Sequence, residues 1–134
     1  MTQVAHTSRE SSEITLELLD AIGDAFNRND IDAVMSFFAD DALFDHAAGP
    51  DVNGTRIAGA EAIRAAFSGL FDTVNSVHWT ILDARIAGDK AYCEYLRVAE
   101  PSSGGRQEFD SVDVLTFRDG LIVHKNTYYK NRSS

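Results

Sequence analysis

The chain has 134 residues, 44% of them hydrophobic, which is enough for one compact domain with a full core. Lysine and arginine total 12 against 21 aspartates and glutamates, and the net charge of −9 argues against nucleic acid or an anionic membrane as a partner. One cysteine, no secretion-signal pattern and no apolar run of roughly 18 residues together lead us to expect a cytoplasmic protein without a disulfide or a membrane span.

Helical patterns occupy the first half of the chain. Residues 1–11 are polar and without periodicity, which predicts a disordered tail before a single domain at 12–134. Apolar residues then recur at helical spacing in three segments, residues 12 to about 29, 31–38 and 60–71. Ser12 can cap the first helix and Asp30 the second. Residues 42–46 predict a short strand, and the glycine- and proline-containing run after it predicts a loop.

From Val74 onward the apolar period changes to two, which is typical of strands. Strands are expected at residues 76–87 and 90–99, joined by Gly88-Asp89, and a long antiparallel hairpin at 106–130, turning at Asp119-Gly120. Helices therefore come first and antiparallel strands last. This order predicts an α+β domain, one curved sheet with the helices packed on one face.

Two aspartates interrupt the first strand of the long hairpin, although aspartate is disfavoured in strands. Asp110 and Asp113 are three residues apart, so they point to opposite faces of the sheet. One of them must face whatever the sheet covers. A covered carboxylate either has a partner or serves chemistry.

Three segments resemble the nuclear transport factor 2-like superfamily, in its branch of ketosteroid isomerases and SnoaL-like polyketide cyclases. They are Asn-Asp-Ile-Asp-Ala-Val-Met-Ser-Phe-Phe-Ala-Asp-Asp-Ala at 29–42, Gly-Ala-Glu-Ala-Ile-Arg at 59–64 and residues 109–120. Their order and spacing extend the resemblance over nearly all of the chain after the tail. The resemblance implies a cystatin-like conical half-barrel, in which three N-terminal helices pack on a curved, mainly antiparallel sheet around a pocket.

The same resemblance implies positions for site residues. Asp113 falls where ketosteroid isomerases place the protonated aspartic acid of their oxyanion hole, and His46 where they place the aspartate that shuttles the proton. Ile22 takes the position of their first-helix oxyanion tyrosine. Tyr129 falls on a pocket-lining aromatic near the end of the last strand. Without that tyrosine, and with a histidine at the base position, the chain does not resemble a standard ketosteroid isomerase.

His46 and Asp113 are our candidate catalytic residues. Histidine titrates near neutrality and can act as acid or base, but His46 could also bond to backbone or lie exposed on its loop. Asp113 could be a neutral donor to an oxyanion or the orienting partner of His46. Its structural alternative is a salt bridge to Arg97 or Lys125. Asp110, on the other face, is expected to be structural.

The remaining candidates line the expected pocket. The register inferred from the family sends Glu94 inward, and with it Tyr92 on the same strand face, although a cross-strand ion pair is the commoner fate of a strand glutamate. Phe109 is expected in the pocket wall or core. We expect no metal and no cofactor, because the histidines lack ligand spacing and no glycine-rich phosphate loop is present.

These residues favour a cofactor-free acid–base enzyme acting on a small hydrophobic molecule with a carbonyl, enol or epoxide. Isomerisation, cyclisation, dehydration and hydrolysis all remain open. So do two non-enzymatic alternatives, a binding module for a hydrophobic metabolite and a domain whose pocket is filled by its own side chains. Apolar residues on both faces of the hairpin, such as Val112 and Leu115, predict a homodimer in every case.

Overall fold

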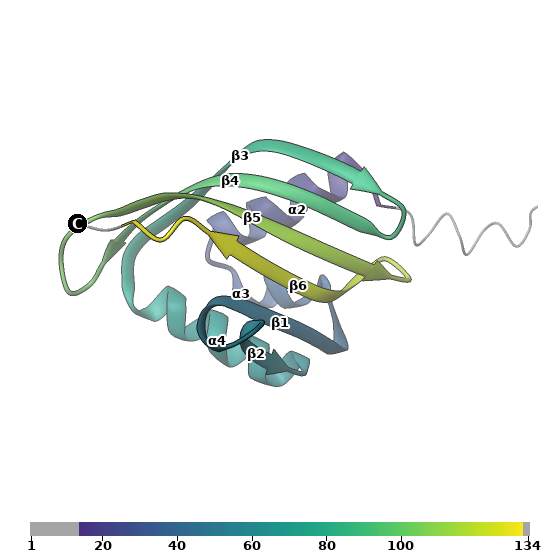
Figure 1. The fold of residues 1–134 in the computed structure, drawn as a ribbon, viewed down its shortest axis with the longest axis horizontal. Coiled ribbons are helices and arrows are strands. Elements are labelled where there is room, and N and C mark those ends of the chain that lie inside the picture. The colour runs from purple at the N-terminus through teal and green to yellow at the C-terminus, as the bar shows by residue number, and fades with distance from the viewer. Residues whose placement is uncertain (1–13, 133–134) are drawn as a thin grey trace, which may run out of the picture.

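The computed structural model describes residues 14–132, so the expected tail at 1–11 lies outside the described residues. The elements in chain order are α2 (Leu16–Asn27), α3 (Ile31–Met35), β1 (Phe38–Asp51), β2 (Gly54–Ala58), α4 (Ala60–Asp72), β3 (Val74–Ala87), β4 (Lys90–Pro101), β5 (Gln107–Arg118) and β6 (Leu121–Tyr129). The described strands form one sheet in the order β2-β1-β6-β5-β4-β3. Its β1–β6 pair is parallel and the other pairs are antiparallel. The helices all lie on one side of this curved sheet (Figure 1), which confirms the predicted α+β half-barrel.

Each helix begins after a capping residue, which is Thr15 for α2, Asp30 for α3 and Gly59 for α4. The first helix starts at Leu16, because Thr15 is extended and its hydroxyl accepts a hydrogen bond from the Leu18 amide at 3.0 Å. The predicted cap, Ser12, lies outside the described residues. Helix α4 matches its prediction to within one residue. No helix in residues 14–132 is long and apolar enough to span a membrane.

The segment between α3 and α4 differs most from the prediction. The second helix ends at Met35 rather than residue 38, and β1 runs through the expected loop as far as Asp51. A two-residue turn then leads into β2, which the sequence pattern did not predict. Gly54 allows this hairpin because its φ of +81° suits glycine and its α-carbon lies close to the β1 backbone. The Asn53-Gly54 dipeptide is a hairpin signal that could have predicted the turn.

The hydrophobic core lies between the helices and the concave face of the sheet. Phe67 of α4 is central to it, with ring centroids 5.2 Å from Phe26, 5.7 Å from Phe38 and 5.1 Å from Phe44. All four rings are at most 9% exposed. Three of them, those of Phe26, Phe44 and Phe67, also line a cavity, so the core forms one wall of the site described next.

Candidate functional site

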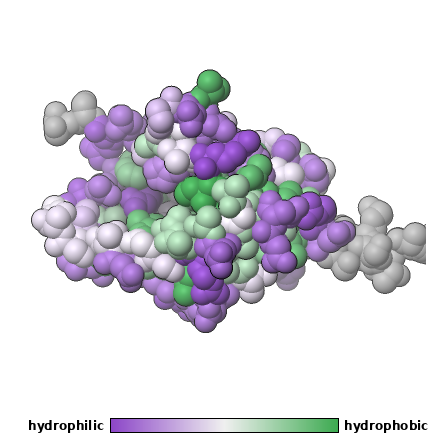
Figure 2. Space-filling view, turned by 90° about the horizontal axis from the view of Figure 1, so that it is seen from below, coloured by the Kyte–Doolittle hydropathy of each residue, from purple (hydrophilic) through white to green (hydrophobic). Residues whose placement is uncertain are grey.

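A cavity of about 940 Å³ lies between the concave face of the sheet and helices α2 and α4. Seen from the side of α4 and β2, the surface is hollowed, with hydrophobic residues at the centre of the hollow and hydrophilic residues around it (Figure 2). This volume is within the range of small-molecule sites, which are roughly 300–1,000 Å³ and mostly apolar with a few polar groups.

Five of the predicted site residues line this cavity, namely Ile22, His46, Phe109, Asp113 and Tyr129. The alternation along β5 places Phe109 and Asp113 on the concave face. The hairpin register then sets Ser111 opposite Tyr129, and Asp113 opposite Thr127. The rings of Phe109 and Tyr129 lie side by side, tilted by 34°, with centroids 4.7 Å apart.

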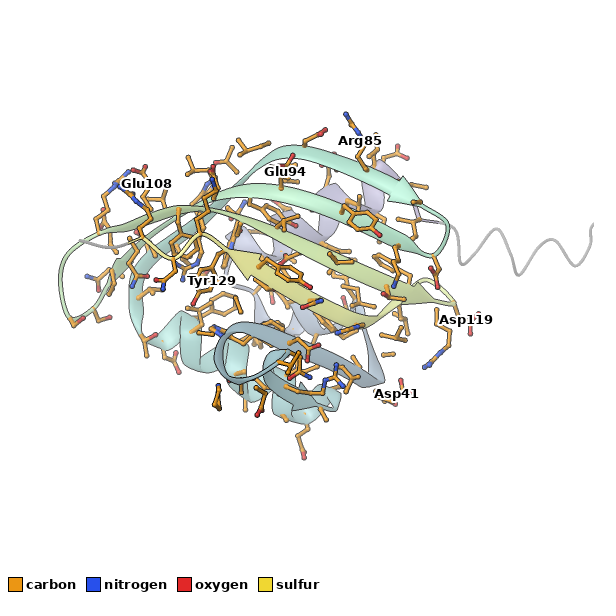
Figure 3. The ribbon with its side chains drawn as sticks, in the orientation of Figure 1. Asp41, Arg85, Glu94, Glu108, Asp119 and Tyr129 are labelled. Atoms are coloured by element: carbon orange, nitrogen blue, oxygen red, sulfur yellow. The ribbon has the colours of Figure 1, made fainter. Side chains whose placement is uncertain are left out.

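The structure corrects the predicted placement of Glu94 and Tyr92. Neither lines the cavity, and both are exposed on the outer face of the sheet. The register pairs Cys93 with Asp113, so the concave face of β4 carries Cys93, Tyr95 and Arg97 instead. The expected register differs by one residue, and such a shift moves every side chain of a strand to the opposite face of the sheet. In Figure 3, Glu94 lies on β4, well away from Tyr129 at the end of β6.

Asp113 belongs to a buried ionic cluster. Its Oδ1 accepts hydrogen bonds from the Thr127 hydroxyl at 2.7 Å and from Lys125 Nζ at 3.3 Å, and Lys125 also donates to Thr127 at 2.8 Å. Asp113 and Lys125 are 8% and 9% exposed. Of the two salt-bridge partners considered from the sequence, the structure selects Lys125. Both of these hydrogen bonds go to the same carboxylate oxygen, Oδ1.

Aromatic rings surround the ammonium group of Lys125. Its Nζ lies 4.7 Å from the ring centroid of Phe44 and 5.8 Å from those of Phe26 and Phe67. Such cation–π contacts are strengthened by removal of water. The Asp113 carboxylate and the rings together hold the ammonium group of Lys125 at the cavity wall.

Tyr95 brings a hydroxyl to the same wall and was not among the predicted residues. The side chain is 7% exposed, and burial raises the pKa of Tyr95 well above its ordinary value of 10, with the nearby charge of Asp113 adding to the shift. The hydroxyl therefore stays protonated. Its hydrogen-bond partner is the Cys93 thiol, which is a weak one.

His46 lies exposed where the cavity meets solvent, and no hydrogen bond joins it to Asp113. The Ala48 amide donates to its Nδ1 at 3.1 Å, while the Ala48 carbonyl is farther, at 3.4 Å. From this contact we assign the neutral ring the tautomer with its proton on Nε2. The ring lies edge-on to Tyr129, with centroids 6.1 Å apart. His46 can therefore donate a hydrogen bond from Nε2 to a ligand.

Within residues 14–132, no three His, Cys, Asp or Glu side chains are grouped in a way that could hold a metal ion. The polar groups at the cavity wall are instead ammonium, guanidinium, hydroxyl, imidazole and side-chain amide groups, with one buried and one exposed carboxylate. Sequence reasoning named Lys125 and Arg97 only as salt-bridge partners. Arg97 pairs with Phe109 and Lys125 pairs with Leu115, and both partners face the cavity from β5. A correct strand register would therefore have assigned Arg97 and Lys125 to the site.

Several solved structures share the fold at 18–24% identity. A protein from Catenulispora acidiphila with a ketosteroid isomerase-like fold, crystallised with trimethylamine, is 24% identical, with a TM-score of 0.75 over 87% of this chain and 88% of that one. A candidate polyketide cyclase from Xanthomonas campestris is also 24% identical, with a TM-score of 0.71 over 92% and 93% of the two chains. TerC, co-crystallised with polyporic acid, is 18% identical, with a TM-score of 0.73 over 86% and 90%.

No protein with a curated description matches the chain. The SnoaL-like domain family, by contrast, matches residues 19–125, which include α4, most of α2, all of β1 to β5 and the first half of β6. The chain belongs to the SnoaL-like domain family.

Proposed function

We propose that the chain is a small-molecule enzyme that moves a proton on a substrate held in the cavity. The observation that carries this proposal is the Asp113–Lys125–Thr127 cluster, buried at the wall of an aromatic cavity. A buried ion pair contributes little net stability, because desolvation offsets most of its Coulomb energy. Ionisable groups gathered in a large cleft are typical of functional sites.

The two oxygens of Asp113 have different surroundings. Oδ1 accepts both hydrogen bonds of the cluster, which leaves Oδ2 as the oxygen able to take a proton from a carbon next to a carbonyl group. Lys125 and Tyr95 line the same cavity and would donate hydrogen bonds to the oxyanion that forms. Asp113 is then the base, and His46 donates from the cavity mouth. This reverses the roles expected from the sequence.

Isomerisation, aldol-type cyclisation and dehydration all begin with such a proton abstraction, and the same carboxylate could direct water to an epoxide. The apolar wall favours a small, largely hydrophobic substrate. Two structural neighbours were crystallised with small molecules, which supports a ligand-binding role for the cavity in this fold.

Hydrogen–deuterium exchange provides a test that does not require knowledge of the natural reaction. A panel of enolisable aryl ketones is incubated with the protein in D₂O, and exchange next to the carbonyl is followed by NMR. The wild type should accelerate exchange, and Asp113→Asn should lower the rate by about 100-fold or more, the size typical of losing a general base. Asp110→Asn is the matched control, since Asp110 is an exposed carboxylate on the same strand. Equal losses in both variants would contradict the proposal.

A non-catalytic binding module is the second candidate. It is favoured by the absence of a hydrogen bond between His46 and Asp113 and by the exposed position of His46. In that case the wild type would bind hydrophobic ligands without accelerating exchange, and Asp113→Asn would change only affinity.

A further inference from the structure

We propose that the substrate is an organic carboxylate and that Arg97 binds its carboxylate group. This inference rests on the proposed function, because it takes the same cavity as the substrate site. It adds an anchoring group, at a position separate from the Asp113 cluster, that selects the charge of the substrate.

Arg97 is held in place by aromatic side chains from both neighbouring strands. The strand register sets Trp79 of β3 and Phe109 of β5 directly opposite Arg97 of β4. The guanidinium carbon lies 6.0 Å from the ring centroid of Trp79 and 5.2 Å from that of Phe109. A planar guanidinium held between two aromatic side chains is preorganised for two parallel hydrogen bonds to a carboxylate.

Its charge has no acidic partner among residues 14–132. Within the described part of the chain, Gln107 is the one side chain that accepts a hydrogen bond from it, with Nη1 3.2 Å from Oε1. Six of the other seven described arginines form ion pairs with carboxylates, namely Arg28, Arg56, Arg64, Arg85, Arg106 and Arg118. Arg97 is nevertheless partly buried, and burial lowers the pKa of its guanidinium. A desolvated cation without a counter-charge is suited to bind an anionic ligand.

The balance of charges around the whole cavity wall also favours an anionic ligand. The cavity is lined by five basic side chains, those of Arg97, Arg106, Lys125, Lys130 and Arg132, and by two acidic ones, those of Glu108 and Asp113. The complete chain has the opposite balance, with 12 basic and 21 acidic residues. An acidic protein that lines its cavity with positive charge would attract anions there and repel them elsewhere.

Strand geometry gives the size of the ligand. Arg97 lies four residues along β4 from Cys93, which pairs with Asp113, and four residues span about 13 Å of strand. The ligand would therefore carry its carboxylate on the order of 10 Å from the reacting carbon, with an apolar body between them, about the length of two fused aromatic rings with substituents.

A pair of fluorescent dyes that share one skeleton tests the charge preference. 8-Anilinonaphthalene-1-sulfonate is an anion, and N-phenyl-1-naphthylamine is the same molecule without its sulfonate. Arg97→Met keeps an apolar side chain of similar length but removes the charge. It should weaken binding of the anionic dye by about 10- to 100-fold, as expected for a lost charge-assisted contact, and leave the neutral dye within about twofold. The matched control is Arg85→Met, which removes an exposed arginine outside the cavity.

Competition then compares a carboxylate with a neutral amide on the same ring system. 2-Naphthoate should displace the anionic dye from the wild type at lower concentration than 2-naphthamide does, and this difference should disappear in Arg97→Met. Equal binding of the two dyes, or equal loss of both in Arg97→Met, would overturn the carboxylate inference while the neutral dye still reports an open cavity. If neither dye binds the wild type, the cavity is closed and the inference fails together with the proposed function.

Discussion

Lys125 offers the sharpest test at the scale of single residues. Lys125→Met leaves Asp113 buried without its cation, which typically costs about 3–5 kcal/mol for a fully buried pair. Because this pair lines a cavity that water can enter, we expect a loss of about 2–3 kcal/mol in the free energy of unfolding, measured by urea denaturation. The double variant Asp113→Leu/Lys125→Met removes both charges and should recover much of this loss.

The exposed Arg118–Asp41 pair is the control, since its N···O distance of 2.8 Å is short but both side chains are more than half exposed. Asp41→Asn should leave the urea midpoint close to the wild type. If Lys125→Met has an equally small effect, Lys125 is solvated and does not belong to a buried cluster.

Asp45 shows how one carboxylate couples stability to pH. It is 2% exposed, and its two oxygens accept hydrogen bonds from Arg56 at 2.8 and 2.9 Å, with His124 2.7 Å away. Hydrogen bonding to Arg56 lowers the pKa of Asp45 below its ordinary 3.8, with His124 contributing. The folded protein thus binds this proton less readily than the unfolded chain. The stabilisation is present above pH 3.8 and is lost as pH falls through the lower, folded pKa.

Asp45→Asn should therefore be less stable than the wild type at pH 7, by about 1–3 kcal/mol for the lost charged hydrogen bonds given that Arg56 is half exposed. Its stability should also fall less steeply below pH 4. Urea midpoints measured from pH 7 down to pH 2 check both points. If the urea midpoints of the two proteins fall equally steeply below pH 4, this assignment is contradicted.

At the scale of elements, the β1–β2 hairpin depends on Gly54. A Cβ at this position would overlap the carbonyl oxygen of His46 in β1, so Gly54→Ala must move the strand that carries His46. Gly88 has a comparable φ of +62° but open space around it. Both variants incur the backbone strain of a positive φ, and Gly54→Ala should lose about 1–3 kcal/mol more because of the overlap. Thermal and urea unfolding of both variants measure the difference, and equal losses would rule out close packing at Gly54.

The same hairpin shows why some elements could not be predicted from the sequence. Helix α4 and strands β3 to β6 have a strong period of their own, and their predicted limits lie within two residues of the observed ones. Residues 47–50, Ala-Ala-Gly-Pro, lack strand propensity, and they continue β1 between His46 and Asp51, which both pair with β2 on either side of a register irregularity. Pairing between distant segments carries no local signal.

Register explains the partial prediction of the site. Parity along β5 left Asp110 and Asp113 as alternatives, and the family resemblance put Asp113 and Tyr129 on the pocket side; both line the cavity. On β4 the pattern left two faces to choose from, and the chosen face carried Glu94 rather than Tyr95 and Arg97. Burial decides between them, because Tyr95 is 7% exposed and Glu94 lies in solvent.

At the scale of the whole molecule, the outer face of the sheet exposes large hydrophobic side chains, including Tyr92 at 39% and Tyr128 at 54%. Val112 lies opposite both Glu94 and Tyr128 and is partly exposed on the same face. A contiguous apolar surface on a sheet is typical of an interface. We expect a homodimer through this face, so that sedimentation velocity gives twice the 14.7 kDa of one chain.

The net charge of each chain should make formation of the expected dimer depend on salt concentration. Each chain carries a net −9, so two chains repel one another at low ionic strength, and added salt should strengthen association by screening. Tyr128→Glu places a further negative charge on the proposed interface and should shift the protein to monomer. Val52→Glu is the matched control, because Val52 is fully exposed at the tip of the β1–β2 hairpin. A wild type that remains monomeric in high salt, or a Val52→Glu variant that dissociates as readily as Tyr128→Glu, would show that the outer face is not the interface.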